Sequence, residues 1–430
     1  MAVPNPKQTA TEARLAGVTL PQGAAWSTSA REAALARVRS MGLPGRRDEY
    51  WKFTRPDSLI AAEPPVAAIH DDAAEPEFYG DLDRLKLVFV DGVFDAAQSD
   101  DAALDAVRIE RLEQAGQTDI HWAKDLYGTL EERGQTPVPR PLAALNTALA
   151  RDGMLIHVTG KAAKPIHLVN VQASETSDAL LHHVVKLDAG ASLTVLEHGP
   201  AGARFNTVME VDVADGASFH HVRVQGRDHA RHAATHVFAR LATESVFKSF
   251  TLTANGVMTR NECVIELTGD DATAHVAGAT IGDGDDFHQD DTVFVTHDAE
   301  RCESRQVFKK VLHNGATGVF QGKILVKAGA QKTDGYQISQ SLLLDDDSQF
   351  LAKPELEIYA DDVACSHGST SGAIDEDALY YMRARGIPKA TATNLLTLSF
   401  LAEAVEEIED EDLRDEISTR LASWLELGID

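Results

Sequence analysis

The amino-acid sequence predicts a mainly β protein whose core is a right-handed parallel β-helix, with a helical N-terminal region and a C-terminal helical domain. From Met154 to about Tyr359, short runs such as LIHV, HHVVKL and TVMEVDV alternate apolar and polar residues. Similar corners, DAGASL, ADGASF, HNGATG and KAGAQK, separate some of these runs. Their uneven spacing favours stacked coils over a large β-sandwich, which stays the alternative fold.

The pattern divides the chain into three regions. Residues 1–150 form a helical and mixed N-terminal region, residues 151–370 form the β-helix core, and residues 371–430 form the C-terminal helical domain. In the first region, Ser27 or Ser29 is expected to cap a helix that runs to Met41 and ends at Gly42.

Three further segments of the N-terminal region have recognisable patterns. Residues 61–77, rich in proline, alanine and acidic residues, are expected to form a loop. The run LKLVFVDGVF (85–94) predicts two short strands around an Asp91-Gly92 turn. The run PLAALNTALARDG (141–153) predicts a short helix that ends at Gly153.

The C-terminal region predicts three helices. Asp375 is placed to cap the first, and Gly386 to end it. The second extends from about Thr391 to Ile408, and the third carries an apolar stripe that ends at Trp424. The stripe of the second helix is expected to pack within its own bundle or to face a protein partner, and the residues singled out for that interface are Leu398, Leu401 and Val405.

Composition excludes several classes of protein. The 430 residues contain 40 Lys and Arg against 67 Asp and Glu, which gives a formal charge of −27 and argues against nucleic-acid or anionic-membrane partners. No run approaches the roughly 20 apolar residues of a spanning helix, and three cysteines are too few for a disulfide framework. These features predict a soluble protein of a reducing compartment, located in the cytoplasm.

No catalytic motif is present in the sequence. It lacks G-x-x-x-x-G-K-[ST], so we expect no ATP bound by this chain, and it lacks H-E-x-x-H, C-x-x-C and G-x-S-x-G. We therefore expect that the chain is not an enzyme. Histidines do cluster, and adjacent coils could bring some of them to a metal, although most are expected to have core or surface roles. The clustered histidines are His182, His183, His198, His220, His221, His229, His232 and His236.

The sharpest local constellation is VACSHGST (363–370), in which Cys365 and His367 are two residues apart. On a strand, residues i and i+2 share a face, so the thiol and imidazole would project together. Sulfur and nitrogen donors suit iron or zinc. Two donors do not complete a site, so either other ligands come from elsewhere or Cys365 is a buried thiol beside a hydrogen-bonded histidine.

The segment KPELEIYADDVACSHGSTSGAIDEDALYYMRARGI (353–387) resembles the C-terminal signature of the SufB/SufD family of the SUF iron–sulfur assembly system, and is most similar to its D-type branch. Other matching stretches follow in order along the chain: GLPGRRDEYWKFT (42–54), LVFVDGVF (87–94), LNTALARDG (145–153) and GVFQGKILVKAGAQKTDGYQ (318–337). The resemblance therefore touches nearly the whole chain.

The resemblance implies a scaffold component with a right-handed parallel β-helix. It implies pairing with a B-type SUF subunit through the β-helix and recruitment of a SUF ATPase subunit through the C-terminal helices. A transient iron–sulfur cluster would form at the B–D interface, with His367 as the matching interface histidine and Cys365 beside it. Flavin binding, the iron donor and homodimer formation stay open.

Two other classes of function stay open on the residues alone. A β-helix carbohydrate enzyme would use carboxylates such as those at 345–347 and 361–362, but aromatic residues make up only 6% of the chain. A stand-alone metal-binding β-helix protein would use the clustered histidines. Metal content of the chain purified alone separates the second class from a scaffold.

Overall fold

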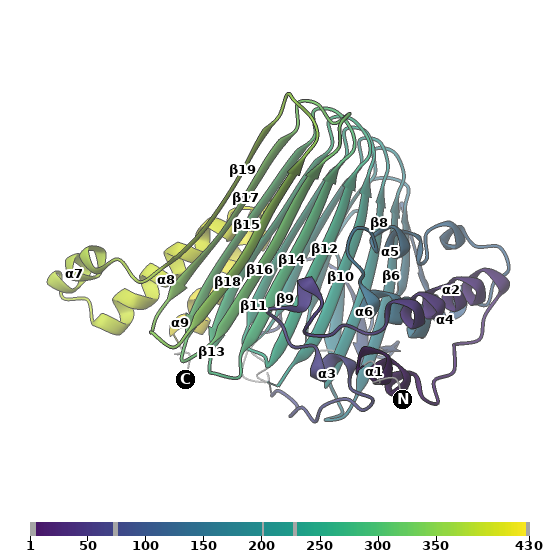
Figure 1. The fold of residues 1–430 in the computed structure, drawn as a ribbon, viewed down its shortest axis with the longest axis horizontal. Helices are drawn as coiled ribbons and strands as arrows, with labels where there is room; N and C mark the ends of the chain where they lie inside the picture. The colour runs from purple at the N-terminus through teal and green to yellow at the C-terminus, as the bar shows by residue number, and fades with distance from the viewer. Residues whose placement is uncertain (1–5, 72–75, 200–201, 227–229, 427–430) are drawn as a thin grey trace.

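The computed structural model describes residues 6–71, 76–199, 202–226 and 230–426. Its centre is a pair of facing sheets, and the chain passes from one sheet to the other at each successive strand from β4 onward, as Figure 1 shows. Among the described residues, ten strands form the first sheet and nine form the second. The predicted parallel β-helix is confirmed, because a β-sandwich would have antiparallel neighbours.

The strands lengthen along the chain from the N-terminal coils. The first sheet contains β1 (Leu85–Val90), β2 (Val93–Asp95), β5 (Ile166–Val171), β7 (Ser192–His198), β9 (Ser218–Gln225), β11 (Val246–Ala254), β13 (Thr273–Asp283), β15 (Glu303–His313), β17 (Asp334–Leu343) and β19 (Ala364–Gly372). The second contains β3 (Val107–Arg111), β4 (Met154–Val158), β6 (Asp178–Leu187), β8 (Arg204–Val213), β10 (His232–Leu241), β12 (Met258–Leu267), β14 (His288–His297), β16 (Thr317–Val326) and β18 (Gln349–Ile358).

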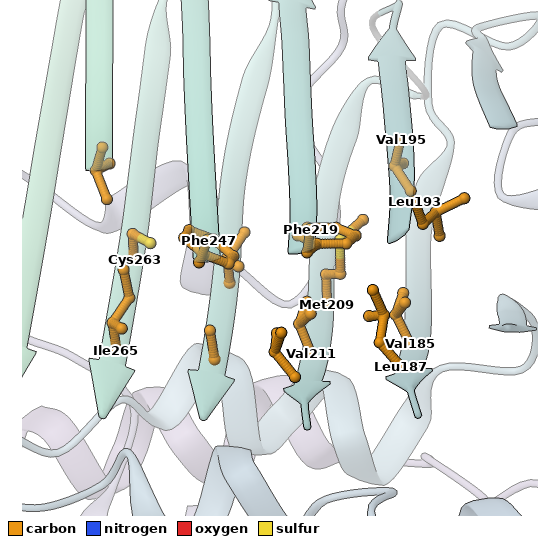
Figure 2. Close-up of a cluster of buried hydrophobic side chains, with 14 of the residues drawn as sticks. Val185, Leu187, Leu193, Val195, Met209, Val211, Phe219, Phe247, Cys263 and Ile265 are labelled. Atoms are coloured by element: carbon orange, nitrogen blue, oxygen red, sulfur yellow. The ribbon is translucent and has the colours of Figure 1, made fainter. Parts of the chain in front are cut away.

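Apolar side chains from both sheets fill the space between them. Phe219 and Phe247 of the first sheet stack at 5.6 Å between ring centroids, and Met209 and Cys263 of the second sheet belong to the same buried cluster (Figure 2). Because strand partners are in register, each inward residue lies beside an inward residue of the next coil. The inside of the molecule is thus a set of parallel columns of side chains.

The N-terminal region contributes strands to the first coil. β1 pairs with β2 in the predicted hairpin, where Asp91 and Gly92 both have positive φ as a type I′ turn requires. β1 then pairs in parallel with β5, and β3 pairs antiparallel with β4. The sheets therefore begin within residues 85–111, which the sequence assigned to the N-terminal region.

Helices of the N-terminal region cover the outer face of the second sheet. They are α1 (Pro6–Leu15), α2 (Ala25–Met41), η1 (Glu49–Trp51), α3 (Asp57–Ile60), α4 (Leu112–Ala115), η2 (Trp122–Asp125), α5 (Thr129–Arg133) and α6 (Pro141–Leu149). Helices α3, α5 and α6 contact β6, β8 and β10 of that sheet. The predicted loop at 61–77 contains no helix or strand in its described part; residues 72–75 lie outside the described residues.

Two predicted helix boundaries in this region are wrong. Helix α2 begins before Ser27, and the Ser27 hydroxyl donates to the Ala24 and Gly116 carbonyls instead of capping the helix. Helix α6 ends at Leu149 rather than Gly153, because the chain turns there into β4. The predicted end of α2 at Gly42 is confirmed; its N–H donates to the Val38 carbonyl.

A buried cluster of charges joins the N-terminal region to the second sheet. Arg140, which precedes α6, contacts Glu262 of β12 at 2.9 Å, and Arg260 contacts the same carboxylate at 2.7 Å. Arg260 also pairs with Asp290 of β14 and donates to the Tyr50 carbonyl. Burial raises the pKa of the Glu262 carboxyl, but the Arg260 and Arg140 guanidiniums outweigh burial and lower that pKa to about 2. The carboxylate is therefore ionised and bridges two cations.

The C-terminal helices α7 (Glu376–Ala384), α8 (Lys389–Val405) and α9 (Glu411–Glu426) follow the last strand. The Asp375 carboxylate accepts from the Asp377 and Ala378 N–H groups, as predicted for an N-cap. Helix α8 contacts β13 and β15 on the outer face of the first sheet, whereas α7 projects beyond the β-helix (Figure 1). No helix among the described residues is both long and apolar enough to cross a membrane.

We expect Glu262→Gln to lower the free energy of unfolding by about 3–5 kcal/mol, because it leaves two buried guanidiniums without their shared carboxylate. The contribution of Glu262 is present above its ordinary pKa of 4.5 and fades as pH falls toward about 2, so the loss should be largest near neutral pH. Urea unfolding at pH 7 measures it. The exposed pair Arg301–Asp271, tested as Asp271→Asn, should leave the free energy of unfolding nearly unchanged, because water and salt screen an exposed ion pair. Equal losses in the two variants would contradict this interpretation.

Candidate functional site at the open end of the β-helix

The last coil of the β-helix leaves two strand edges unpaired. β18 and β19 stand at the ends of the two sheets, and no other strand in the described ranges pairs with their outer edges. Every residue of β18 and β19 is exposed or only partly buried, whereas the strands inside the sheets are largely buried. Unpaired backbone N–H and C=O groups of this kind can bind another strand.

The two open edges differ in chemistry. β18 contains Pro354, which lacks a backbone donor, and its charged side chains are already engaged. Lys353 contacts Glu49 of η1 at 2.8 Å, and Tyr50 donates to Glu355. β19 has the sequence ACSHGSTSG, with no proline and no acidic or lysine side chain. The edge of β19 is therefore the less protected one.

Cys365 and His367 lie on one face of β19, as the spacing predicted, and register shows that this face is the inner face of the coil. Register pairs Cys365 with Gly335 and His367 with Gln337 of β17, and both partners belong to the buried inward face of that strand. The His367 side chain is exposed at the open end, while Cys365 is half-buried. The structure thus brings these two candidate ligands to one face of an edge strand.

Cys365 lies in apolar surroundings. It packs against the cluster that contains Ile324 and Val363, and its sulfur lies over Gly335, where an added Cβ would be 3.2 Å away. Burial raises the pKa of the Cys365 thiol, and the Asp334 carboxylate raises it further. The neutral thiol is thus favoured, and because metals bind the thiolate, His367 is the stronger candidate ligand.

The described residues contain no group of three or more His, Cys, Asp and Glu side chains arranged to hold a metal ion. Most of the clustered histidines have core partners. His182 contacts Glu210 at 2.9 Å, His221 contacts Glu197 at 2.7 Å, and His198 contacts His167 at 2.7 Å. His229 lies outside the described residues. The predominantly structural role expected for these histidines agrees with this arrangement.

The predicted partner residues on α8 lie against the chain's own first sheet. Leu401 and Val405 are 0% and 2% exposed, and Leu398 packs against the same cluster. Of the two alternatives left open for this stripe, the structure shows packing within the chain, although the stripe covers apolar side chains of β13 and β15 as well as contacting the neighbouring helices. The exposed apolar side chains of this region are instead Tyr380, Tyr381 and Leu395.

A separate open cleft of about 570 Å³ lies at the other end of the molecule, beside the β1–β2 turn and the end of α1. Its charges are largely satisfied within the protein: Arg14 pairs with Asp178 at 2.5 Å, and Arg111 pairs with Asp152 at 2.5 Å. The lining contains three arginines and four carboxylates, and most of these charges are already paired with one another.

The fold and the open coil define a β-helix protein with helices on both outer faces, an edge available for strand addition, and an incomplete pair of ligands at that edge. A model of the SufBD core domain of the SUF iron–sulfur cluster assembly system matches residues 169–400. A model of the SufBD N-terminal region matches residues 22–168. The chain belongs to the SufBD family and has a role in SUF iron–sulfur cluster assembly.

Curated relatives match nearly end to end. The iron–sulfur cluster assembly protein SufD of Escherichia coli (strain K12) is 29% identical over 92% of this chain and 92% of its own length. The protein of the same name from Bacillus subtilis (strain 168) is 25% identical over 92% of this chain and 93% of its own length. A SufBD family protein of Synechocystis is 26% identical over 88% of this chain and 86% of its own length.

We expect Cys365 to alkylate more slowly at pH 7.5 than a cysteine in a short unstructured peptide, the free-thiol reference, because its raised pKa leaves less thiolate. The rate should rise as pH increases above 9. Cys263 and Cys302 are buried and should react more slowly still. Iodoacetamide labelling followed by peptide mass spectrometry measures each thiol, with Cys365→Ser as the control. Labelling of Cys365 faster than the cysteine of the reference peptide would contradict the assignment of a neutral thiol.

Proposed function

We propose that this chain is the D-type scaffold subunit of a SUF complex, which pairs with a B-type subunit through the open coil and supplies one ligand to a cluster that forms between them. The observation that carries the proposal is the open end of the β-helix. There, an unprotected strand edge and an exposed imidazole occur together, while the described residues hold no complete metal site.

Edge pairing accounts for the exposed last coil. A second β-helix that presents a similar end can continue either sheet by adding strands, and backbone hydrogen bonds then satisfy the open edges. The proline and engaged charges of β18 favour β19 as the principal pairing edge. The same edge can also accept a second copy of this chain, so mass measurement of the chain alone distinguishes a homodimer from a complex that requires the B-type subunit.

The iron–sulfur cluster is cargo in this proposal. His367 is exposed on the edge that the partner would cover, and a neutral imidazole is a good iron ligand. Cys365, with its raised pKa, would bind only after it loses its proton to a base or to the metal. The remaining ligands would come from the partner. This divided site explains why one chain carries only two candidate donors.

Recruitment of the ATPase subunit is assigned to the projecting C-terminal segment. The rings of Tyr380 and Tyr381 on α7 are exposed, and a separate hollow of about 300 Å³ lies between the end of β19 and α8, where Leu342 and Phe400 help to line it. Aromatic side chains that are exposed together are typical of protein interfaces. Leu398, Leu401 and Val405 would support this surface from beneath, so Leu401→Asp should unfold α8 rather than abolish one contact.

We expect His367→Ala to reduce the iron and sulfide bound by the purified complex to a small fraction of the wild-type content, because one of few ligands is removed. Stability of the free chain should change by less than about 0.5 kcal/mol, since the ring is exposed. Cys365→Ser should have a smaller effect on the cluster. Iron, sulfide and cluster absorbance at equal protein measure the change. Normal loading of the His367→Ala complex would remove His367 from the ligand set.

A charge on α7 should weaken ATPase binding selectively. Tyr380 is 75% exposed, so Tyr380→Asp should leave folding intact while binding to the ATPase subunit falls by about tenfold or more. Ile120 is 86% exposed on the opposite side of the chain, near η2, and Ile120→Asp is the matched control. Titration calorimetry with the isolated ATPase subunit compares the two. If both variants bind as the wild type does, α7 is not the recruiting surface.

A further inference from the structure

We propose that Gln337 is a positioning residue for His367. The two side chains are not hydrogen-bonded in the structure; rotation of the exposed His367 side chain would let one ring N–H donate to the unpartnered side-chain oxygen of Gln337, and this bond would hold the imidazole in a single tautomer and leave the other ring nitrogen free. This inference deepens the proposed function, because it rests on His367 acting as a ligand, and it adds a specific role for a residue inside the β-helix.

The two residues are neighbours in one inward column. Strand register places Val276 of β13, Gln306 of β15, Gln337 of β17 and His367 of β19 side by side on successive coils. Val276 belongs to the apolar core between the sheets, so the column faces inward. After Val276 the residues of this column are polar, and the column finishes at the exposed imidazole.

The amide of Gln337 has a defined direction. Its Nε2 donates to Oε1 of Gln306 on the preceding coil at 3.0 Å. Its Oε1 is fully buried and has no hydrogen-bond partner among the described residues. The amide nitrogen is thus engaged with β15, and the oxygen is the unused acceptor of this side chain. That acceptor belongs to the residue that strand register places directly beside His367.

Gly322 makes room for this arrangement. It lies on β16 of the opposite sheet, and an added Cβ there would overlap with Nε2 of Gln337. The Gln337 side chain thus extends across the interior into the space that a larger residue would fill. Glycine inside a strand weakens it and often marks a close approach, and here the approaching group is the Gln337 amide.

A fixed tautomer matters because only one nitrogen of a neutral imidazole can bind a metal. A neutral ring has one N–H donor and one bare nitrogen, and only the bare nitrogen binds a metal. Metal-binding histidines usually donate their other N–H to a fixed acceptor, which sets the tautomer and the ring orientation. An uncharged amide that is itself held by Gln306 provides such an acceptor without adding a charge to the interior.

The test compares ring tautomers in the full chain purified alone. Selectively ¹⁵N-labelled histidine is observed by NMR, and His367 is assigned by its absence from the His367→Asn spectrum. Wild-type protein should show one dominant tautomer for His367. Gln337→Met, of similar length but with no acceptor, should shift it toward the mixture of free imidazole. Gln337→Glu should retain one tautomer, because Gln306 can donate through its unpartnered Nε2 to one carboxylate oxygen while the other accepts from His367.

Ser341→Ala is the matched control. Ser341 lies on the same inward face of β17 and donates to Ser371 of β19 at 2.8 Å, so its loss removes a bond between these strands without touching the Gln337 column. It should leave the tautomer of His367 unchanged. If Gln337→Met fails to fold, Gly322→Ala displaces the amide and serves as the second variant.

Cluster loading supplies the second readout. In the complex, Gln337→Met should lower the affinity for iron by about 10- to 100-fold, and Gln337→Glu should restore much of it. A mixed tautomer in the wild type, or an unchanged tautomer in both Gln337→Met and Gly322→Ala, would overturn the positioning role. Normal cluster loading in His367→Ala would overturn the ligand role alone, since the tautomer is measured without a metal or a partner.

Discussion

The parallel hydrogen-bond ladder between coils is the constraint on which the rest of the structure depends. Each strand obtains half of its backbone partners from the coil before it and half from the coil after it, so every interior coil is satisfied by its neighbours. The strands of the last coil have no following coil in the described part of the chain, so the backbone N–H and C=O groups on their outer edges stay unpaired. The exposed edges of β18 and β19 therefore follow from the architecture, and the residues on them are the ones a partner can reach.

Register also determines what lies inside. Because columns run the length of the β-helix, a polar residue at one inward position is placed against the residues of the coils on both sides. Lys310 is buried with Asp291 at 2.6 Å, and Arg223 is buried with Glu197 at 2.7 Å, so charged groups enter the interior as pairs. Apolar pairs such as the stacked Phe219 and Phe247 therefore share the interior with these charged pairs.

The repeated corners and alternating runs favoured the parallel β-helix over a β-sandwich without excluding the sandwich, and the spacing of Cys365 and His367 predicted their shared face. The sequence pattern did not predict strands such as β15 and β17, because the inward residues Gln306, Lys310 and Gln337 are polar and interrupt the alternation of apolar and polar residues. Packing of the Leu401 stripe on the first sheet could not be predicted, because a helical stripe has the same pattern whether it faces other helices, a sheet of its own chain or a partner. The relation of Gln337 to His367 depends on coil length, which local sequence does not specify.

The contact between η1 and β18 has a consequence for biosynthesis. Tyr50 binds Glu355, a residue 305 positions later in the chain, and Glu49 binds Lys353 beside it. During synthesis on the ribosome, the N-terminal segment emerges long before β18, so its contacts with β18 can form only after the intervening coils have been made. The contacts of Tyr50 and Glu49 with β18 therefore form only when the last coil is present. Until then, the most recently made coil is the one whose strand edges are unpaired.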